Sequence, residues 1–247
     1  MRIAFLADVH SNLEALTACL ADAESRRAGK LVFLGDLVGY GADPAAVVRR
    51  VMKLVERGAV AVLGNHEEAV TGELRPSMHV DAQAAIAWTR ERLDREELDF
   101  LTSLPVKVHD EGRLYVHANA WAPEDWEYVR GEFQAERSMR ATPCRITVCG
   151  HVHEPALYHM SGEGRASAFR PVPGVSIPLG SLRRWLLIPG SAGQPRDGNP
   201  AACYAVYDDE ATAVTYFRVP YDHETAARKI LEAGLPEALS VRLALGR

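Results

Sequence analysis

Short apolar runs that end abruptly in polar residues recur along the chain. They lie at 3–7, 31–35, 59–64, 114–116 and 146–150. Continuous apolar runs of this length, without alternation of polar and apolar residues, are typical of strands that are buried on both faces. The pattern therefore predicts a sheet that is covered by other elements on both sides.

Helix-type patterns lie between several of these runs. Over 11–29, Ser11 and Glu14 predict a capping box, and leucines then recur at helical spacing. Over 43–58, Asp43 is the expected N-cap and a proline occupies the first helical position. The alternation of strand and helix predicts βαβ units and a largely parallel sheet.

The second half of the chain has a different pattern. A helical insertion is expected at about 67–103, with a second capping box that starts at Asp94. Three later runs, at 183–190, 202–209 and 213–220, are rich in β-type residues and are bounded by Gly, Pro and Asp. We expect them to form meander strands of a second sheet, followed by a helix at 222–234. One α/β domain over 1–247, built from two sheets, is the simplest account.

The composition narrows the class of protein. The chain has 247 residues, of which 47% are hydrophobic, and a formal net charge of -5. A mildly acidic chain argues against stable nucleic-acid binding, which needs a basic face. The four cysteines form no C-x-x-C pair and are expected to be buried thiols in a reducing compartment. The sequence shows no leader pattern and no apolar run of membrane-spanning length, so we expect a cytoplasmic protein without membrane contact.

Chemically active side chains follow each of the five apolar runs. They are Asp8, His10, Asp36, Asn65, His66, His117, His151 and His153. Ligands of open α/β sheets bind outside the carboxyl ends of the strands. We therefore expect these eight residues to meet on one edge of one sheet. If the segment 149–155 is extended, the two histidines of its H-x-H pair also point to the same side.

Each of these residues alone has an ordinary structural explanation. An Asp after a strand is often a helix N-cap, and Gly35 and Gly64 can be simple turn glycines. The remaining histidines are expected to lie outside the site because none follows a buried-type run in a paired motif; they are His79, His109, His159 and His223. The prediction of a site depends on the occurrence of all eight residues, in this order, at the ends of five predicted strands.

The motifs DVH, GD, GNHE, VH and GHVH, in this order and spacing, resemble the signature motifs of the calcineurin-like metallophosphoesterases. The segments GDLVGYGADP, WTRERL and IPGSAGQPRDGNPAACYAVYD resemble the small prokaryotic phosphodiesterase-like branch, which is related to diadenosine tetraphosphatases. The resemblance covers nearly the whole chain. It implies a four-layer α/β/β/α sandwich of two mixed sheets flanked by helices, with a dinuclear metal site.

The resemblance also implies a role for each residue. Asp8, His10 and His153 would hold one metal ion. Asn65, His117 and His151 would hold the other, and Asp36 would bridge both. His66 would bind no metal and would act on the substrate, by stabilising the transition state or by protonating the leaving alkoxide.

This set of ligands favours particular metals and one reaction. Imidazole suits Mn, Fe, Co, Ni or Zn, and manganese is the expected choice. Only two carboxylates would face two divalent ions, so positive charge remains for a phosphate group. Two-metal sites activate a bridging hydroxide for in-line attack at phosphorus. The expected function is hydrolysis of a phosphodiester or phosphomonoester in a small phosphorylated substrate, of which a nucleotide is one candidate.

Three further residues have two interpretations each. Trp121 and Trp126 follow the fourth motif and either form a wall for a base or an apolar leaving group or pack within their loop. Arg196 either pairs with a substrate phosphate or forms a surface turn with Asp197.

Other functions compete with a phosphoesterase. A metal-bearing scaffold without turnover would be expected to lose His66 or a ligand, and this chain keeps all eight residues. A nuclease would need a basic stripe, which the sequence lacks. Protein-phosphatase activity and assembly into a homo-oligomer are left open by the sequence.

Overall fold

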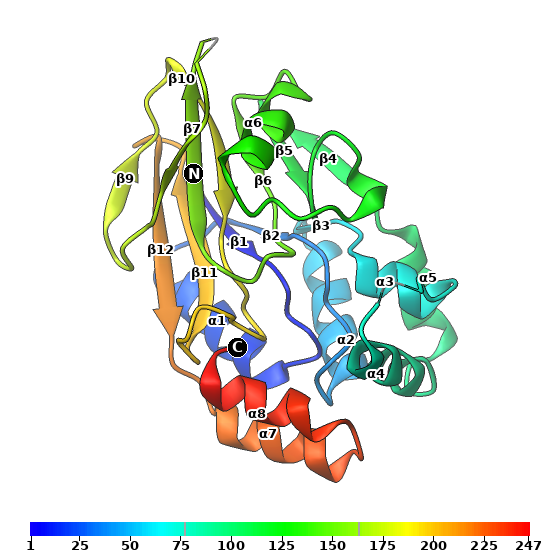
Figure 1. Cartoon of the computed structure of the whole chain (residues 1–247). Coiled ribbons are helices and arrows are strands. Elements are labelled where there is room, and N and C mark those ends of the chain that lie inside the picture. Colours follow the sequence, from blue (N-terminus) through cyan, green and yellow to red (C-terminus); the bar gives the residue numbers. More distant parts are fainter. Residues whose placement is uncertain (77, 163) are drawn as a thin grey trace.

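Two six-stranded mixed sheets form the centre of the protein in a computed structural model, which describes residues 1–76, 78–162 and 164–247 (Figure 1). The first sheet has the strand order β3–β2–β1–β11–β12–β9. Its bounds are β1 Arg2–Leu6, β2 Lys30–Phe33, β3 Val60–Ala61, β9 Ser176–Pro178, β11 Ala202–Asp208 and β12 Ala213–Val219.

The second sheet has the strand order β4–β5–β6–β10–β7–β8. Its bounds are β4 Lys107–Asp110, β5 Arg113–Val116, β6 Ile146–Val148, β7 Ala156–Ser161, β8 Ser167–Phe169 and β10 Arg183–Ile188. In each sheet a parallel part pairs with antiparallel strands: β1 is parallel to β2, and β6 is parallel to β5 and β10.

The assignment of strands to sheets differs from the sequence prediction. The five apolar runs do not share one sheet, because β1, β2 and β3 lie in the first sheet whereas β5 and β6 lie in the second. The three late strands do not form a separate meander either. β10 joins the second sheet, and β11 pairs antiparallel with β1. Apolar patterns report burial, which both sheets share, and carry no information on pairing partners.

Helices flank the pair of sheets. Their bounds are α1 Leu13–Ser25, α2 Pro44–Val55, α3 Asn65–Thr71, α4 Val80–Arg90, α5 Arg95–Ser103, α6 Glu132–Arg140, α7 His223–Glu232 and α8 Glu237–Leu245, with a short 3-10 turn η1 at Pro123–Asp125. The stretch 67–103 contains the end of α3 and all of α4 and α5. The sequence pattern gave no prediction for α6, α8, β4 or β7–β9.

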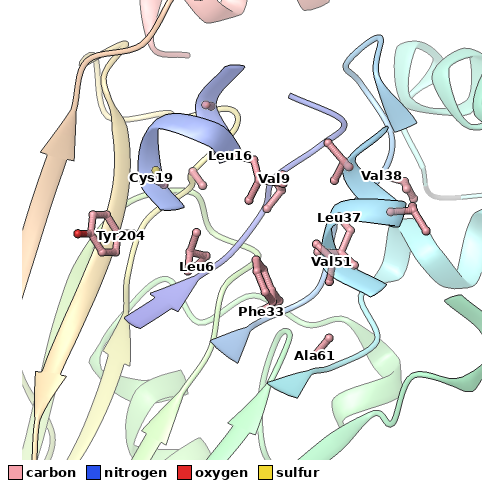
Figure 2. Close-up of a cluster of buried hydrophobic side chains, with 14 of the residues drawn as sticks. Leu6, Val9, Leu16, Cys19, Phe33, Leu37, Val38, Val51, Ala61 and Tyr204 are labelled. Carbon is pink, nitrogen blue, oxygen red and sulfur yellow. The ribbon is translucent and has the colours of Figure 1, made fainter. Parts of the chain in front are cut away.

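Three apolar cores separate the layers. The core between the sheets contains Phe5, Tyr115 and Trp185, whose side chains come from both sheets. The outer face of the first sheet packs on α1 and α2, and Figure 2 shows this cluster around Leu6, Phe33 and neighbouring side chains. The outer face of the second sheet packs on α6. The arrangement confirms the predicted α/β/β/α sandwich.

The start of α1 differs from the predicted capping box. Asn12, and not Ser11, is the N-cap, since its side chain accepts a 3.0 Å hydrogen bond from the backbone N–H of Ala15. Asp43 makes no side-chain cap at α2 and instead pairs with Lys229 at 2.8 Å. The capping box predicted at Asp94 is present.

The cysteines agree with the sequence prediction of buried thiols. All four cysteines are buried and unpaired. In the part of the chain that the structure describes, none of the helices combines the length and the apolar character needed to cross a bilayer.

Candidate metal centre

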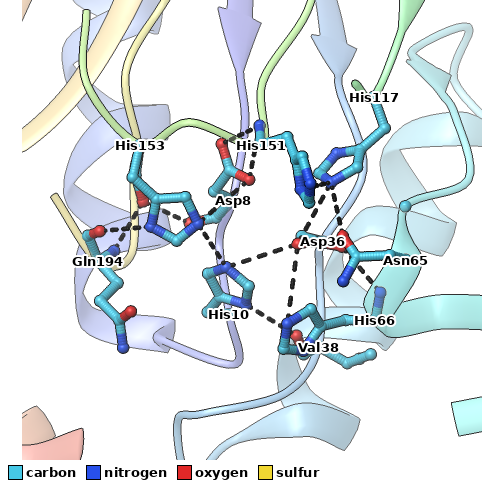
Figure 3. Close-up of polar contacts among 12 residues, drawn as sticks. Asp8, His10, Asp36, Val38, Asn65, His66, His117, His151, His153 and Gln194 are labelled. Atoms are coloured by element: carbon cyan, nitrogen blue, oxygen red, sulfur yellow. Dashed lines mark hydrogen bonds and ion pairs between the residues drawn. The ribbon is translucent and has the colours of Figure 1, made fainter. Parts of the chain in front are cut away.

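The eight predicted side chains meet where strands from both sheets end. Asp8 and His10 follow β1, Asp36 follows β2, and the others follow β3, β5 and β6. Figure 3 shows Asp36 between two groups of side chains that come from different strands. The prediction of one edge of one sheet is therefore wrong in detail: the site spans the adjacent edges of two packed sheets.

The first group contains Asp8, His10, Asp36 and His153, whose ligand atoms all lie within 4.8 Å of one another. Nε2 of His153 lies 3.4 Å from Oδ1 of Asp8, and Nε2 of His10 lies 3.7 Å from Oδ2 of Asp36. All four residues are buried. A buried group of two carboxylates and two imidazoles could hold one divalent ion.

The second group contains Asp36, His117 and His151. Nε2 of His117 lies 3.3 Å from Oδ2 of Asp36 and 3.1 Å from Oδ1 of Asn65. Asn65 thus adds an amide oxygen to this group. Asp36 belongs to both groups, as expected for a carboxylate that bridges two ions.

Hydrogen bonds at Nδ1 fix the ring orientation and the tautomer of His10 and His153. Nδ1 of His10 lies 3.0 Å from the carbonyl oxygen of Val38, and Nδ1 of His153 lies 2.7 Å from that of Gln194. A carbonyl only accepts, so each Nδ1 carries a proton. Burial lowers the pKa of both histidines well below the usual value, so both rings are neutral. Their Nε2 lone pairs then face each other at 3.1 Å, and a cation fits this arrangement.

The second pair of imidazoles repeats this arrangement. Nδ1 of His117 donates to the Leu34 carbonyl at 2.7 Å, and Nε2 of His151 donates to the Trp126 carbonyl at 2.9 Å. The remaining nitrogens, Nε2 of His117 and Nδ1 of His151, face each other at 3.0 Å. The donor set therefore fits a metal ion here as well.

The pKa values of His117, Asp36 and Asp8 show how burial and neighbouring charges act on the site. Burial alone would lower the pKa of His117, but the Asp36 carboxylate outweighs it and raises the pKa to about 9. Burial likewise acts to raise the pKa of Asp36, but His117 and His66 hold it well below its usual value. Burial raises the pKa of Asp8 to about 8. A proton on His117 balances Asp36 where a metal ion would do the same.

The backbone of the site is in the left-handed region at several ligand candidates. The residues are Asp8 (φ 55°), His10 (φ 48°), Asp36 (φ 54°), His151 (φ 68°) and His153 (φ 66°). The segment 149–155 is therefore a curved loop beyond β6, and not the extended segment considered from the sequence. Its two histidines reach different groups: His151 contacts His117, and His153 contacts His10.

Motif glycines keep space for the ligand candidates. A Cβ on Gly35 would lie 2.7 Å from Nδ1 of His117, and one on Gly150 would lie 2.9 Å from Oδ2 of Asp8. A Cβ on Gly64 would overlap the Asp36 carboxylate. Gly35 and Gly64 are thus more than turn glycines, because any larger residue would displace a ligand candidate.

His66 lies beside the two groups. Its Nε2 is 3.9 Å from Oδ2 of Asp36, and its buried Nδ1 has no hydrogen-bond partner within the described residues. A Cβ on Gly39 would overlap the imidazole, so this glycine keeps the ring in place. Burial lowers the pKa of His66. The ring is therefore neutral at pH 7 and can donate an N–H hydrogen bond toward the adjoining cleft.

The sequence prediction missed Glu67, whose side chain holds two loops of the site in place. The carboxylate is fully buried and accepts hydrogen bonds from the backbone N–H groups of Asp36 (2.7 Å), Leu37 (2.7 Å), Val38 (3.2 Å) and Gly64 (2.9 Å). Both ligand loops are thereby held to one side chain. The signal was present in the GNHE motif, but only its Asn and His were given roles.

A cleft of about 420 Å³ opens beside the groups. Its lining includes His66, Tyr128, Trp126 and Arg196, together with His79, which the sequence prediction had placed outside the site. Trp126 therefore faces the cleft. Trp121 is absent from the lining and packs near Arg137 within its own layer.

Arg196 does not form the turn with Asp197 considered above, since Asp197 pairs with Arg218. The Arg196 guanidinium instead donates to Oε1 of Gln194 at 2.8 Å. The arginine is thus left to face the cleft.

Comparisons with known proteins agree with this geometry. A sequence profile described as the calcineurin-like phosphoesterase superfamily domain matches residues 1–212. The crystal structure of a metallophosphoesterase from Sphaerobacter thermophilus superposes with a TM-score of 0.88 at 36% identity, covering 100% of this chain and 99% of that chain.

Two relatives differ in how much of the chain they match. An uncharacterized protein of Methanocaldococcus jannaschii is 36% identical over 250 residues, which is 99% of this chain and 98% of that protein. A symmetrical bis(5'-nucleosyl)-tetraphosphatase of Bordetella pertussis is 36% identical over 97 residues, which is 38% of this chain and 34% of that protein.

Proposed function

Because the chain belongs to the calcineurin-like phosphoesterase superfamily, we propose that it is a metal-dependent hydrolase of phosphodiester bonds, with phosphomonoesters as a second substrate class. The observation that carries the proposal is the convergence of imidazole lone pairs and carboxylates on two points that share Asp36. At the first point, the lone pairs of the neutral His10 and His153 rings face each other and would repel without a cation between them.

We assign two divalent transition-metal ions to these points, and manganese is our first choice. The first ion would be held by Asp8, His10, Asp36 and His153, and the second by Asp36, Asn65, His117 and His151. When bound, such a pair activates water for in-line attack at phosphorus and neutralises the phosphoryl oxygens.

His66 is the catalytic residue of the proposal. It lines the cleft next to both groups, and its ring is neutral because burial lowers its pKa. A neutral imidazole donates an N–H to a phosphoryl oxygen or to the leaving oxygen, and such placement contributes about 10²–10⁴-fold to the rate. Arg196 is assigned to a phosphate group of the substrate, since its guanidinium has no carboxylate partner within the described chain.

The cleft and one relative support a small-molecule substrate. The cleft of about 420 Å³ suits a small molecule rather than a folded protein. One relative is a bis(5'-nucleosyl)-tetraphosphatase, so small nucleotides are the first class to test. The net charge of -5 speaks against a nuclease.

The proposal is tested by hydrolysis of bis-p-nitrophenyl phosphate and p-nitrophenyl phosphate, metal by metal, on stripped protein. Wild type is compared with Asp36→Asn and His66→Ala, and metal content is measured for each. We expect metal-dependent cleavage of the diester, loss of activity and of bound metal in Asp36→Asn, and a loss of about 10²-fold or more at full metal content in His66→Ala.

The same measurement separates the alternatives. Full metal content without turnover of either ester would favour a metal-bearing scaffold. Unchanged turnover in His66→Ala would remove this residue from the catalytic step. Activity on a plasmid that falls steeply with added salt would instead indicate a nuclease.

A further inference from the structure

The cleft beside the metal-ligand groups contains more positive charge than one phosphate needs. Its lining includes three arginines, Arg75, Arg196 and Arg242, and the exposed carboxylate of Asp125. A substrate with a single phosphate would be bound by the metal site alone and would leave the arginines of the cleft without a partner. The question is therefore which of the three guanidinium groups already pairs with a carboxylate.

The charge of Arg75 is already used. Its Nε and its terminal nitrogen pair with Glu68 at 2.8 and 2.9 Å, and it also donates to the carbonyl oxygen of Glu124. Trp126 donates to the same Glu68 carboxylate at 2.8 Å. Arg75 thus belongs to a structural network that stabilises the wall of the cleft.

Arg196 and Arg242 are in a different state. Both are half-buried. Arg196 donates to the neutral amide oxygen of Gln194 and also contacts Tyr40, and neither partner is a carboxylate. Within residues 1–76, 78–162 and 164–247, the guanidinium of Arg242 takes part in no hydrogen bond or ion pair of the structure. Partly desolvated guanidinium groups without a carboxylate suit a multivalent anion.

Backbone contacts join the two segments that carry these arginines. Arg242 lies on α8, and Gly246, at the end of that helix, accepts a 2.8 Å backbone hydrogen bond from Gly198 in the loop of Arg196. A Cβ on Gly246 would lie 2.6 Å from the backbone of Asn199, so the helix end and the loop touch. The backbone N–H of Arg196 also lies 3.4 Å from the carbonyl oxygen of His153. One ligand candidate, the loop and the helix thus form a continuous wall.

We propose that Arg196 and Arg242 form a second anion site in this cleft, and that the preferred substrate carries a second phosphate besides the one that is attacked. This inference rests on the proposed function for its first phosphate. A guanidinium binds two oxygens of a phosphate at once, which neither a neutral amide nor a lysine reproduces. The C-terminal helix α8 therefore determines specificity, although it lies outside residues 1–212 that match the family profile.

The experiment measures binding, so that it does not depend on turnover. Metal-loaded protein is titrated with methylphosphonate and with methylenediphosphonate by calorimetry, with the free metal concentration held constant. These probes differ in the number of phosphonate groups and resist hydrolysis. We expect wild type to bind the diphosphonate at least tenfold more tightly, and Arg242→Gln and Arg196→Gln each to reduce this preference about tenfold, since charged hydrogen bonds are lost.

Two further variants make the result specific. Arg228→Gln removes an exposed arginine of α7 that pairs with Glu232, and it should keep the full preference. Arg242→Lys keeps the charge but loses the two-pronged contact, and it should fall between wild type and Arg242→Gln.

The outcomes separate this inference from the proposed function. Equal binding of both probes by wild type, or an unchanged preference in both Gln variants, would overturn the second anion site. Absence of ester hydrolysis together with a preference that depends on Arg242 would support the anion site and refute the proposed hydrolase.

Discussion

Glu67 illustrates, at the scale of a residue, a role that the sequence could not reveal. The motif gave its position, but the four backbone donors that it holds come from loops whose approach depends on the fold. The candidate ligands, in contrast, were predictable, because each follows a strand end and only the pairing of strands was uncertain. A reactive residue at a strand end can be recognised from the neighbouring sequence, whereas a contact between two distant loops cannot.

Replacing Glu67 with Gln should destabilise the protein by about 2–4 kcal/mol. The substitution turns one carboxyl oxygen into an NH₂ group that faces two backbone donors, and each buried donor without a partner costs about 1–3 kcal/mol. The measurement is urea unfolding of metal-stripped protein. Glu96→Gln, at an exposed position of α5, is the control and should change the free energy of unfolding by less than about 0.5 kcal/mol. A cost in Glu67→Gln no larger than that of the control would contradict the role.

Asn12 acts at the scale of elements, because it joins three segments. Its Oδ1 caps α1, and its Nδ2 donates to the carbonyl oxygen of Gly193 at 2.8 Å and to the hydroxyl of Tyr221 at 3.1 Å. The sequence predicted this helix within a residue of its start but chose Ser11 as its cap. The φ of 53° at Ser11 explains the difference, since an N-cap normally has extended backbone.

Asn12→Ala should therefore cost more than the loss of a cap alone. The cap contributes about 1 kcal/mol, and the two further hydrogen bonds bring the expected loss to about 2–3 kcal/mol. Asp222→Ala, which removes a side-chain cap from α7 and leaves no buried group behind, provides the comparison. Thermal or urea unfolding of both variants gives the difference. Equal losses would show that the bonds to Gly193 and Tyr221 add nothing.

At the scale of the whole molecule, ion pairs tie the two sheets together beside their shared apolar core. Lys30 of the first sheet pairs with Asp110 of the second at 2.9 Å, and Arg113 of the second sheet reaches Asp209 at 2.9 Å. The sequence predicted two sheets and several of the helices, but it assigned some strands to the wrong sheet. Pairing depends on contacts such as these, which join residues far apart in the chain and leave no periodic pattern.

Asp110→Asn should lower stability by about 1–2 kcal/mol at pH 7. Burial acts to raise the pKa of Asp110, but the hydrogen bond from Tyr115 and the charge of Lys30 outweigh it, so the folded pKa lies below the usual value. Stability from a lowered carboxyl pKa is complete above the unfolded value of about 3.9 and is lost as the pH falls through the folded pKa.

The stability difference between wild type and Asp110→Asn should thus stay constant from pH 7 to about pH 5 and shrink below about pH 4. Urea unfolding across this range measures it. The control Asp99→Asn removes an exposed pair with Arg95, and its effect should stay below about 1 kcal/mol at every pH. A difference that grows as the pH falls would refute the assignment.

The left-handed backbone at Asp8, His10, Asp36, His151 and His153 has a consequence for the history of the chain. Each such residue costs about 1–2 kcal/mol relative to glycine in the same conformation. A lineage freed from selection for chemistry would become more stable by replacing them, and its site would erode first at these positions. Stability alone would therefore favour the loss of these side chains from the site.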